Sequence, residues 1–425
     1  MSRTFFRGAV LALATATSLL AIQSAQAATD PAAVVKHYAE IAHAKYEDSL
    51  TTAKALDTAI DALIAAPGEE ALKAAREAWI AARVPYQQTE AYRFGNPLVD
   101  EWEGKVNAWP LDEGLIDYVD ASYGTDSDEN ALFTANVIAN PKIKVDGADV
   151  DASAITPELI SSLQEAGGIE ANVATGYHAI EYLLWGQDLN GTNAGAGNRP
   201  YTDFDTKACT GGNCDRRAAY LKAASTLLIS DLEEILAAWA PDGEATKAVT
   251  EKPEAGLSAM LTGMGSLSYG ELAGERMKLG LLLHDPEEEH DCFSDNTHNS
   301  HLNDQLGIQT AYTGEYTRVD GTKMAGPSLK ALVAGKDAAL DAELTGKLDT
   351  TVAAMQAMAK RAETTEAYDQ MIGEGNAEGN AVVQAAIDGL IDQTKSIERV
   401  ISSLDLGTIE LEGSDSLDNP NAVFQ

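Results

Sequence analysis

The sequence predicts an all-α protein with a degenerate internal duplication. Long segments repeat apolar residues at spacings of three and four, which is the period of an amphipathic helix. Hydrophobic residues make up 45% of the 425-residue chain and aromatic residues 6%. This balance suits close-packed helices better than β-sandwiches. The long helical segments also occur in two successive series, and the second series resembles the first.

The N-terminal 27 residues predict a signal peptide. Arg3 and Arg7 precede an apolar run that ends in Ala25-Gln26-Ala27, a pattern typical of signal peptidase sites. No cysteine stands at the cleavage point, and no later run reaches the roughly 18 apolar residues of a membrane span. We therefore expect an exported protein without a transmembrane segment, either periplasmic or associated with the outer membrane.

The first series contains two long helices and one short helix. Residues 31–66 form one amphipathic helix, which ends at a Pro-Gly pair. A second helix begins at residue 69 and kinks at Pro85, because proline lacks the backbone donor that a helix interior requires. After an irregular stretch, an apolar helix covers residues 169–185 and is followed by a loop.

The second series is expected to contain helices over residues 216–240, 254–283, 327–364 and 379–404. Faint matches relate the series: Tyr86 with Tyr269, Asp112 with Asp295, and residues 179–184 with 386–391, which sets His178 against Ala385. We therefore divide the mature chain into a first half (28–200), a second half (201–410) and a tail (411–425). Chance similarity between alanine-rich helices is the alternative.

The net charge and the cysteine content limit the classes of ligand and partner that the protein can bind. The net charge is −36, which repels nucleic acid and anionic lipid but concentrates cations; simple solvation of the surface is the alternative explanation. Cys209 and Cys214 flank a Gly-Gly turn, so we expect a disulfide between them in an oxidising compartment, with Cys292 free. A zinc site is not expected there, because a second cysteine pair is missing.

The stretch "GYHAIEYLLWGQD" places His178 and Glu181 three residues apart on an apolar helix. Residues i and i+3 are neighbours on a helix, so the two side chains converge. They form either two ligands of a metal or a buried ion pair, since a buried glutamate without a partner costs several kcal/mol. Metal binding by His178 would weaken as pH falls through about 6.5, whereas an ion pair would raise the histidine pKa.

Further candidate ligands must come from other segments. Glu90, Asp112 and Glu113 could face the motif, because helical bundles build carboxylate–histidine metal sites from facing helices. Asp295 and His298 belong to a histidine-rich and acidic segment, where Asp295 or Asn296 could equally cap the next helix. Each of these residues could instead be a solvated polar group. Glu271 and Glu275 lie one helical turn apart, and Arg276 could neutralise one of them. We expect these residues to form a charge pair on the helix surface.

Five segments in order resemble one known family. They are "ARVPYQQTEAYRFG", "NAWPLDEGLIDYV", the G-x-H-x-x-E pattern at Gly176, His178 and Glu181, "YGELAGERM" and "EHDCFSDNTH". The mature chain, over roughly residues 30–410, is similar to the imelysin family and to its iron-regulated subgroup. The resemblance implies two helical-bundle halves with the motif in a cleft between them, and a role in either proteolysis or iron uptake.

We therefore expect a transition-metal site at His178, Glu181, Glu90, Glu113, Asp112, Asp295 and His298, with iron preferred over zinc or copper. The expected function is metal or metal-chelate binding for iron uptake, with an iron-transport partner in the envelope. A metallopeptidase is the alternative, although the chain lacks H-E-x-x-H, H-x-x-E-H and G-x-S-x-G motifs. An assembly protein with a buried polar network is the third reading.

Overall fold

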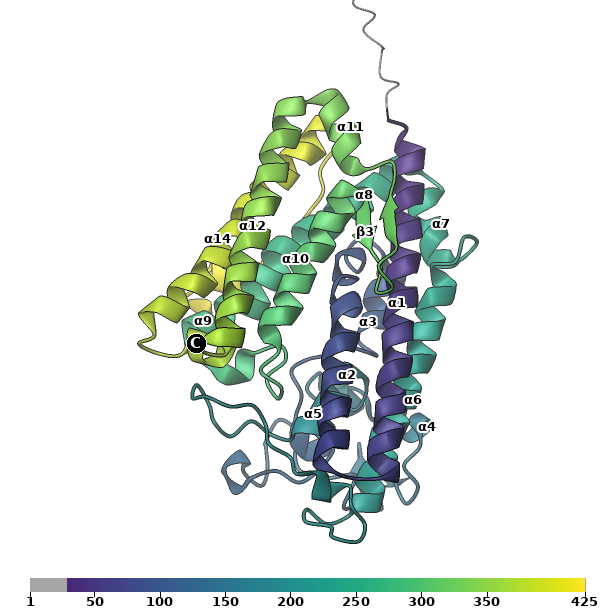
Figure 1. Ribbon diagram of the computed structural model, residues 1–425, viewed down its shortest axis with the longest axis vertical. Helices are drawn as coiled ribbons and strands as arrows, with labels where there is room; N and C mark the ends of the chain where they lie inside the picture. The colour runs from purple at the N-terminus through teal and green to yellow at the C-terminus, as the bar shows by residue number, and fades with distance from the viewer. Residues whose placement is uncertain (1–28, 425) are drawn as a thin grey trace, which may run out of the picture.

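A computed structural model describes residues 29–424, and its architecture is all-α, as predicted (Figure 1). The expected signal peptide lies outside the described residues. Among the described residues, strands occur only in two antiparallel hairpins: β1 (Lys142–Val145) with β2 (Ala148–Asp151), and β3 (Glu315–Thr317) with β4 (Lys323–Ala325). No described helix has the length and apolar character needed to cross a bilayer.

Helix α5, which carries the histidine motif, belongs to a first group of four helices. They are α1 (Pro31–Ala65), α2 (Glu69–Gln87), α5 (Gly176–Trp185) and α6 (Cys214–Ala238). The Asp30 side chain accepts a hydrogen bond from the Ala32 backbone N–H at 3.0 Å, and Pro31 occupies the first helical position, so α1 starts there. Helix α2 ends two residues after Pro85.

Short elements connect these helices. Between α2 and α5 lie η1 (Glu90–Tyr92), α3 (Pro97–Glu103), η2 (Glu113–Leu115), η3 (Ala121–Tyr123), the first hairpin, α4 (Pro157–Leu163) and η4 (Ala166–Gly168). The loop after α5 contains η5 (Tyr201–Asp203). The predicted disulfide between Cys209 and Cys214 is confirmed, and Cys292 is free. This bond ties the loop to the start of α6.

The second group follows α7 (Glu244–Thr250). It comprises α8 (Pro253–Ser266), η6 (Leu267–Lys278), α9 (Leu279–Leu283), η7 (Pro286–Glu288), α10 (Thr297–Thr313), α11 (Leu329–Lys336), α12 (Ala338–Thr364), α13 (Tyr368–Ile372) and α14 (Ala377–Ser403). The short α15 (Asp415–Asp418) and η8 (Ala422–Phe424) end the described chain. The predicted helix over 254–283 is continuous, but its middle, η6, is a π-helix. The predicted helix over 327–364 is two helices, because Asp337 caps the start of α12.

The two groups lie side by side (Figure 1). Helix α6 packs on α1, α4 and α5, although it follows the expected boundary at residue 200. Helix α10 packs on α2, and α8 packs on both α1 and α14, so one hydrophobic core extends through both groups. The duplication and its boundaries therefore remain predictions, while the packing of α10 on α2 brings the two groups together at the motif.

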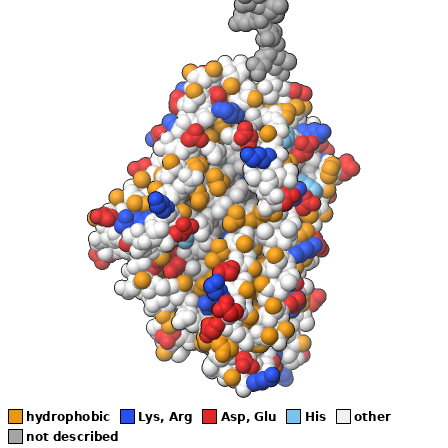
Figure 2. Space-filling model, viewed as in Figure 1, with side chains coloured by type: hydrophobic (Ala, Val, Ile, Leu, Met, Phe, Trp, Pro, Cys, Tyr) orange, Lys and Arg blue, Asp and Glu red, His pale blue; other side chains and the backbone are white. Residues whose placement is uncertain are grey.

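Charged side chains of both signs are interspersed with apolar ones on the face drawn in Figure 2. The acidic excess of the chain is therefore not gathered into one patch on this face. The second hairpin docks on α1 through Asp48, which accepts hydrogen bonds from the Tyr316 hydroxyl at 2.7 Å and from Arg318 Nη2 at 2.7 Å.

Helix α5 is shorter than predicted, because the expected helix over 169–185 begins only at Gly176. Gly176 has φ +78°, which an L-residue inside a right-handed helix cannot adopt without strain. A Cβ there would lie 2.3 Å from the Val106 carbonyl oxygen. The next residue, Tyr177, donates its backbone N–H to that same oxygen at 2.7 Å. The glycine of the motif thus sets the close approach that orients α5.

Replacing Gly176 with alanine should lower the free energy of unfolding by about 2 kcal/mol or more, because both the backbone angle and the space exclude a Cβ. Urea unfolding measures the loss. The control is Gly346→Ala in α12, where no atom lies within 4 Å of the new Cβ; this change should be neutral or stabilise by up to about 1 kcal/mol. Equal stability of Gly176→Ala and the wild type would refute this role for Gly176.

Candidate metal centre

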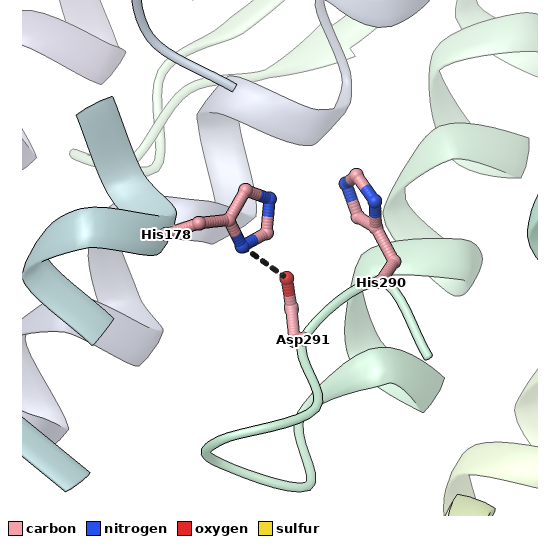
Figure 3. Close-up of side chains that lie close together, drawn as sticks. All are labelled: His178, His290 and Asp291. Atoms are coloured by element: carbon pink, nitrogen blue, oxygen red, sulfur yellow. Dashed lines mark ion pairs between the residues drawn. The ribbon is translucent and has the colours of Figure 1, made fainter. Parts of the chain in front are cut away.

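Two segments that are distant in the sequence meet at the candidate site. His178 and Glu181 lie on α5, and His290 and Asp291 lie on the segment 289–293, which runs between η7 and α10. Figure 3 shows the two imidazole rings next to each other, with the Asp291 carboxylate directed towards His178. The ring centroids are 4.8 Å apart and the ring planes are inclined at 76°. One ligand atom from each of His178, His290 and Asp291 lies within 4.8 Å of the other two. These three residues form the only such group among the described residues, and we call it the His178 cluster.

The cluster is buried. The relative exposure is 1% for His178, 2% for His290 and 0% for both Glu181 and Asp291. The family resemblance implied a site in a cleft, but the packing of the segment 289–293 against α5 encloses these side chains. Buried polar groups need partners, so their hydrogen bonds can be followed one by one.

Asp291 is held by four neighbouring side chains. Its Oδ1 accepts a hydrogen bond from Arg83 Nη2 at 2.8 Å, and its Oδ2 accepts from Asn296 Nδ2 at 3.0 Å and from the Ser300 hydroxyl. Its backbone N–H donates to Thr297 Oγ1 at 3.0 Å. These contacts orient the carboxylate, whose Oδ1 lies 3.9 Å from His178 Nδ1.

His178 contacts Glu181 through one ring nitrogen only. His178 Nδ1 and Glu181 Oε2 are 3.0 Å apart, while Glu181 Oε1 accepts hydrogen bonds from the Ser294 backbone N–H at 3.0 Å and from its hydroxyl at 2.6 Å. His178 Nε2 and both ring nitrogens of His290 are buried and have no hydrogen-bond partner. Glu181 therefore orients His178, and the unpartnered nitrogens are the ones available to a ligand.

The pKa values show how protons are distributed in the cluster. Burial first, and then the positive charge of Arg83, lower the pKa of His178 from 6.5 to about 3. Burial also lowers the pKa of His290 well below its usual range. Burial acts to raise the pKa of Asp291, but Arg83 outweighs it and the pKa is lowered. For Glu181, burial and the nearby Asp291 raise the pKa well above its usual range.

These pKa shifts contradict the expectation that His178 changes its charge near pH 6.5. Both histidines are neutral at physiological pH, so protonation of His178 near pH 6.5 does not control the site, and the contact with Glu181 is not an ion pair. Asp291 and Arg83 carry opposite charges that offset each other, while burial and Asp291 favour the protonated form of Glu181. In its protonated form the Glu181 hydroxyl would donate to His178 Nδ1. Arg83 therefore balances the charge of the His178 cluster, whose imidazoles are in the neutral form that coordinates metals.

Glu90 lies in a neighbouring ion network and not in the His178 cluster. Its Oε2 accepts a hydrogen bond from Arg276 Nη2 at 2.8 Å, and Arg276 also contacts Glu271 Oε1 at 2.8 Å and Asp304 Oδ2 at 3.3 Å. Arg276 is buried, so the prediction that Glu271 and Arg276 form a charge pair on the helix surface is wrong. The π-helix η6 carries both residues, and π-helical turns are frequent at functional sites.

The other predicted ligands also lie outside the three-residue group. Glu113 accepts a hydrogen bond from Gln187 Nε2 at 3.3 Å, and burial, with Glu287 nearby, raises its pKa to about 7. Asp112 accepts from Asn130 Nδ2 at 2.5 Å. Asp295 and His298 lie at the start of α10, where Asn296 is the N-cap residue. Burial raises the pKa of Asp295 to about 7 and lowers that of His298.

Sequence reasoning missed His290 and Asp291. Both lie in "EHDCFSDNTH", which the family resemblance singled out, but Asp295 and His298 from that segment were chosen instead. The feature of the sequence that could have indicated them is that a histidine and an aspartate stand next to each other. The role of this pair depends on its contacts with Arg83 and α5, and no local sequence pattern predicts those contacts.

Carbon-13 labelling of histidine gives a direct test of these charges. The His178 ring signal should stay constant between about pH 5 and pH 8, because its pKa is about 3, and a His178→Gln spectrum would assign it. The same protein in urea is the control, since an exposed imidazole titrates near about 6.5. A midpoint at or above this value in the folded protein would restore the ion-pair reading.

Comparison with known proteins places the chain in a family. The profile of the peptidase family imelysin matches residues 42–397, and no curated protein matches the chain. A crystal structure described as an iron-regulated protein A precursor from Parabacteroides distasonis ATCC 8503 is 20% identical, with a TM-score of 0.62, covering 88% of this chain and 94% of that one.

An imelysin-like protein from Psychrobacter arcticum 273-4 is 16% identical, with a TM-score of 0.54, covering 90% of this chain and 99% of that one. At these identities the two structures establish similarity of fold alone. The family profile, in contrast, spans most of the chain, including α5 and the segment 289–293. The chain therefore belongs to the imelysin family.

Proposed function

We propose that this protein is an exported metal-binding protein that holds a transition metal, iron in preference to zinc or copper, in the His178 cluster and acts in iron uptake or homeostasis. The observation that carries the proposal is the set of buried, unpartnered ring nitrogens on His178 and His290 beside a charged Asp291. Unsatisfied buried polar atoms are rare. A metal ion would bind one nitrogen of each ring.

The donor chemistry supports iron. Two imidazoles and one carboxylate form the ligand set of many non-haem ferrous sites, although zinc and copper also accept imidazole. Glu181 would orient His178 from behind, as carboxylates do for metal-bound histidines. The names of the related structures, an iron-regulated protein and an imelysin-like protein, agree with this choice. An envelope iron-transport partner and a periplasmic or outer-membrane location are parts of the same proposal.

Metallopeptidase activity is the alternative, and one observation favours it. His178, His290 and Asp291 supply three protein ligands, which is the number in a catalytic zinc site with one open position. Their burial argues against it, because a polypeptide substrate must reach the metal-bound water. Glu181 is also occupied by His178 and Ser294 and is not free to act as a general base.

Calorimetric titration of demetallated protein with ferrous ion under anaerobic conditions should give one saturable site. His178→Ala and His290→Ala should each weaken binding by at least about 100-fold, because each removes a ligand. His43→Ala on α1 is the matched control, since His43 lies outside the cluster, and it should bind as the wild type does. Zinc and cupric ions, titrated in parallel, rank the preference for the metal.

Unchanged binding in both cluster variants would remove the His178 cluster as the site. Chelator-sensitive cleavage of a denatured protein substrate, lost in Glu181→Gln, would favour the peptidase instead. Absence of any saturable binding, with thermal stability insensitive to metals, would leave a buried polar network as the role of these residues.

Metal binding should also release about one proton near neutral pH. The raised pKa of Glu181 leaves it protonated in the free protein. A metal can bind His178 Nε2 only if that nitrogen carries no proton, so the ring proton must be on Nδ1. Nδ1 then donates to Glu181, and the proton that Glu181 carried is released. Metal affinity should therefore rise with pH. Titrations in two buffers of different ionisation enthalpy count the proton. Glu181→Gln should release fewer protons and bind about 10-fold to 100-fold more weakly; proton release equal to the wild type would refute this assignment.

A further inference from the structure

The segment 411–418, which follows α14, lies against the end of α8 and the π-helix η6. The Glu412 backbone N–H donates a hydrogen bond to Ser266 Oγ, the last residue of α8, at 3.1 Å. The Ser416 hydroxyl donates to the Gly274 carbonyl oxygen of η6 at 2.9 Å. Both ends of the segment are therefore tied to this continuous helix.

Three glycines form the surface that the segment covers. A Cβ added to any of them would lie within 2.7 Å of an atom of the segment, namely of Leu411 for Gly265, of Glu412 for Gly270 and of Ser414 for Gly274. Real side chains do not approach so closely, so the segment can lie this near to the helix only because these positions lack a Cβ.

The spacing of the three glycines fits a π-helix and does not fit an α-helix. Gly265 and Gly274 are nine residues apart, and in an α-helix with about 3.6 residues per turn they would lie on opposite faces. A π-helix, whose hydrogen bonds join residues five apart, winds more loosely, so spacings of five and then four residues keep all three on one face. The surface under the segment therefore exists only while η6 is π-helical.

The length of η6 also calls for support from outside the helix. It extends over 12 residues, whereas π-helical structure is rare and occurs mostly as single turns within α-helices. The segment 411–418 supplies such support, because it packs along the glycine face and donates a hydrogen bond to a carbonyl oxygen of η6.

The winding of η6 determines where Arg276 points. Arg276 Nη2 donates to Glu90 Oε2 of η1 at 2.8 Å, and its Nη1 donates to Asp304 Oδ2 of α10 at 3.3 Å. Asp304 lies one helical turn after Ser300, which donates to Asp291 of the His178 cluster. Each residue of an α-helix turns by about 100° around the axis, so a return of η6 to the α-helical form would move Arg276 away from both carboxylates.

We infer that the segment 411–418 is a strap that holds η6 in its π-helical form and thereby aims Arg276 at Glu90 and Asp304. The strap covers the face that π-helical winding gives to the three glycines, and its removal would favour the common α-helical winding. The role is one of positioning, and it does not depend on metal binding at the His178 cluster.

The substitution Gly274→Ala tests the strap, because the new Cβ would collide with Ser414. Hydrogen exchange of the 411–418 backbone amides measures docking of the strap, and it should become at least about tenfold faster. The Nε–H signal of Arg276, observed after nitrogen-15 labelling of arginine and assigned with Arg276→Lys, reports the ion network. This signal should shift or disappear in Gly274→Ala.

A second substitution, Ser414→Gly, removes the atoms that collide with the new Cβ, and glycine replaces serine at the start of a helix at little cost. The double variant Gly274→Ala with Ser414→Gly should therefore regain the exchange rate and the Arg276 signal of the wild type. The control is Gly346→Ala in α12, where the added Cβ meets no atom within 4 Å, and it should change neither measurement.

Faster exchange with an unchanged Arg276 signal would refute the inference, because the segment would then add stability without positioning Arg276. Wild-type behaviour of Gly274→Ala, or failure of Ser414→Gly to restore the signal, would refute it as well. Should Gly274→Ala not fold, the double variant Tyr269→Phe with Ser416→Ala replaces it. This variant removes two hydrogen bonds between η6 and the strap without adding bulk; it should lose the Arg276 signal, and retention of that signal overturns the inference.

Discussion

The ion pair between Arg83 and Asp291 is the interaction on which the candidate metal centre depends. It joins α2 to the segment 289–293, and both side chains are fully buried. Two unpaired charges at this depth would cost several kcal/mol each, so the pair keeps these segments together. Arg83 also donates to Asn107 Oδ1 at 2.6 Å and lies 5.1 Å from the centre of the Tyr177 ring. With Arg83 placed in this way, α5 can set His178 beside Asp291.

The same ion pair determines where the protons reside. Arg83 keeps Asp291 charged and disfavours a second positive charge on His178, so the imidazole stays neutral. The negative charge of Asp291 in turn adds to burial in keeping Glu181 protonated. One arginine thus offsets the charge of Asp291 and keeps His178 neutral, while Glu181 holds the His178 ring in place from behind. A buried polar network with full hydrogen bonding would not leave three ring nitrogens without partners.

The segment 289–293 serves two environments with different chemistry. His290 and Asp291 belong to the His178 cluster, whereas Glu289, Cys292 and Phe293 line a neighbouring small cavity. One short segment therefore brings His290 and Asp291 to the candidate metal centre while its other side chains pack in a separate place.

The sequence alone determined the helices and the local half of the site. The helical period located α1, α6 and α14 to within two residues of their observed ends. The pairing of His178 with Glu181 was predictable because residues three apart on a helix are always neighbours. Only the tertiary structure decided the rest: the positive φ of Gly176 shortened α5, Arg276 drew Glu90 into a separate network, and Arg83 brought Asp291 and His290 to His178. The physical reason is that local geometry follows from spacing, whereas the partner of a buried charge depends on which distant segments pack around it.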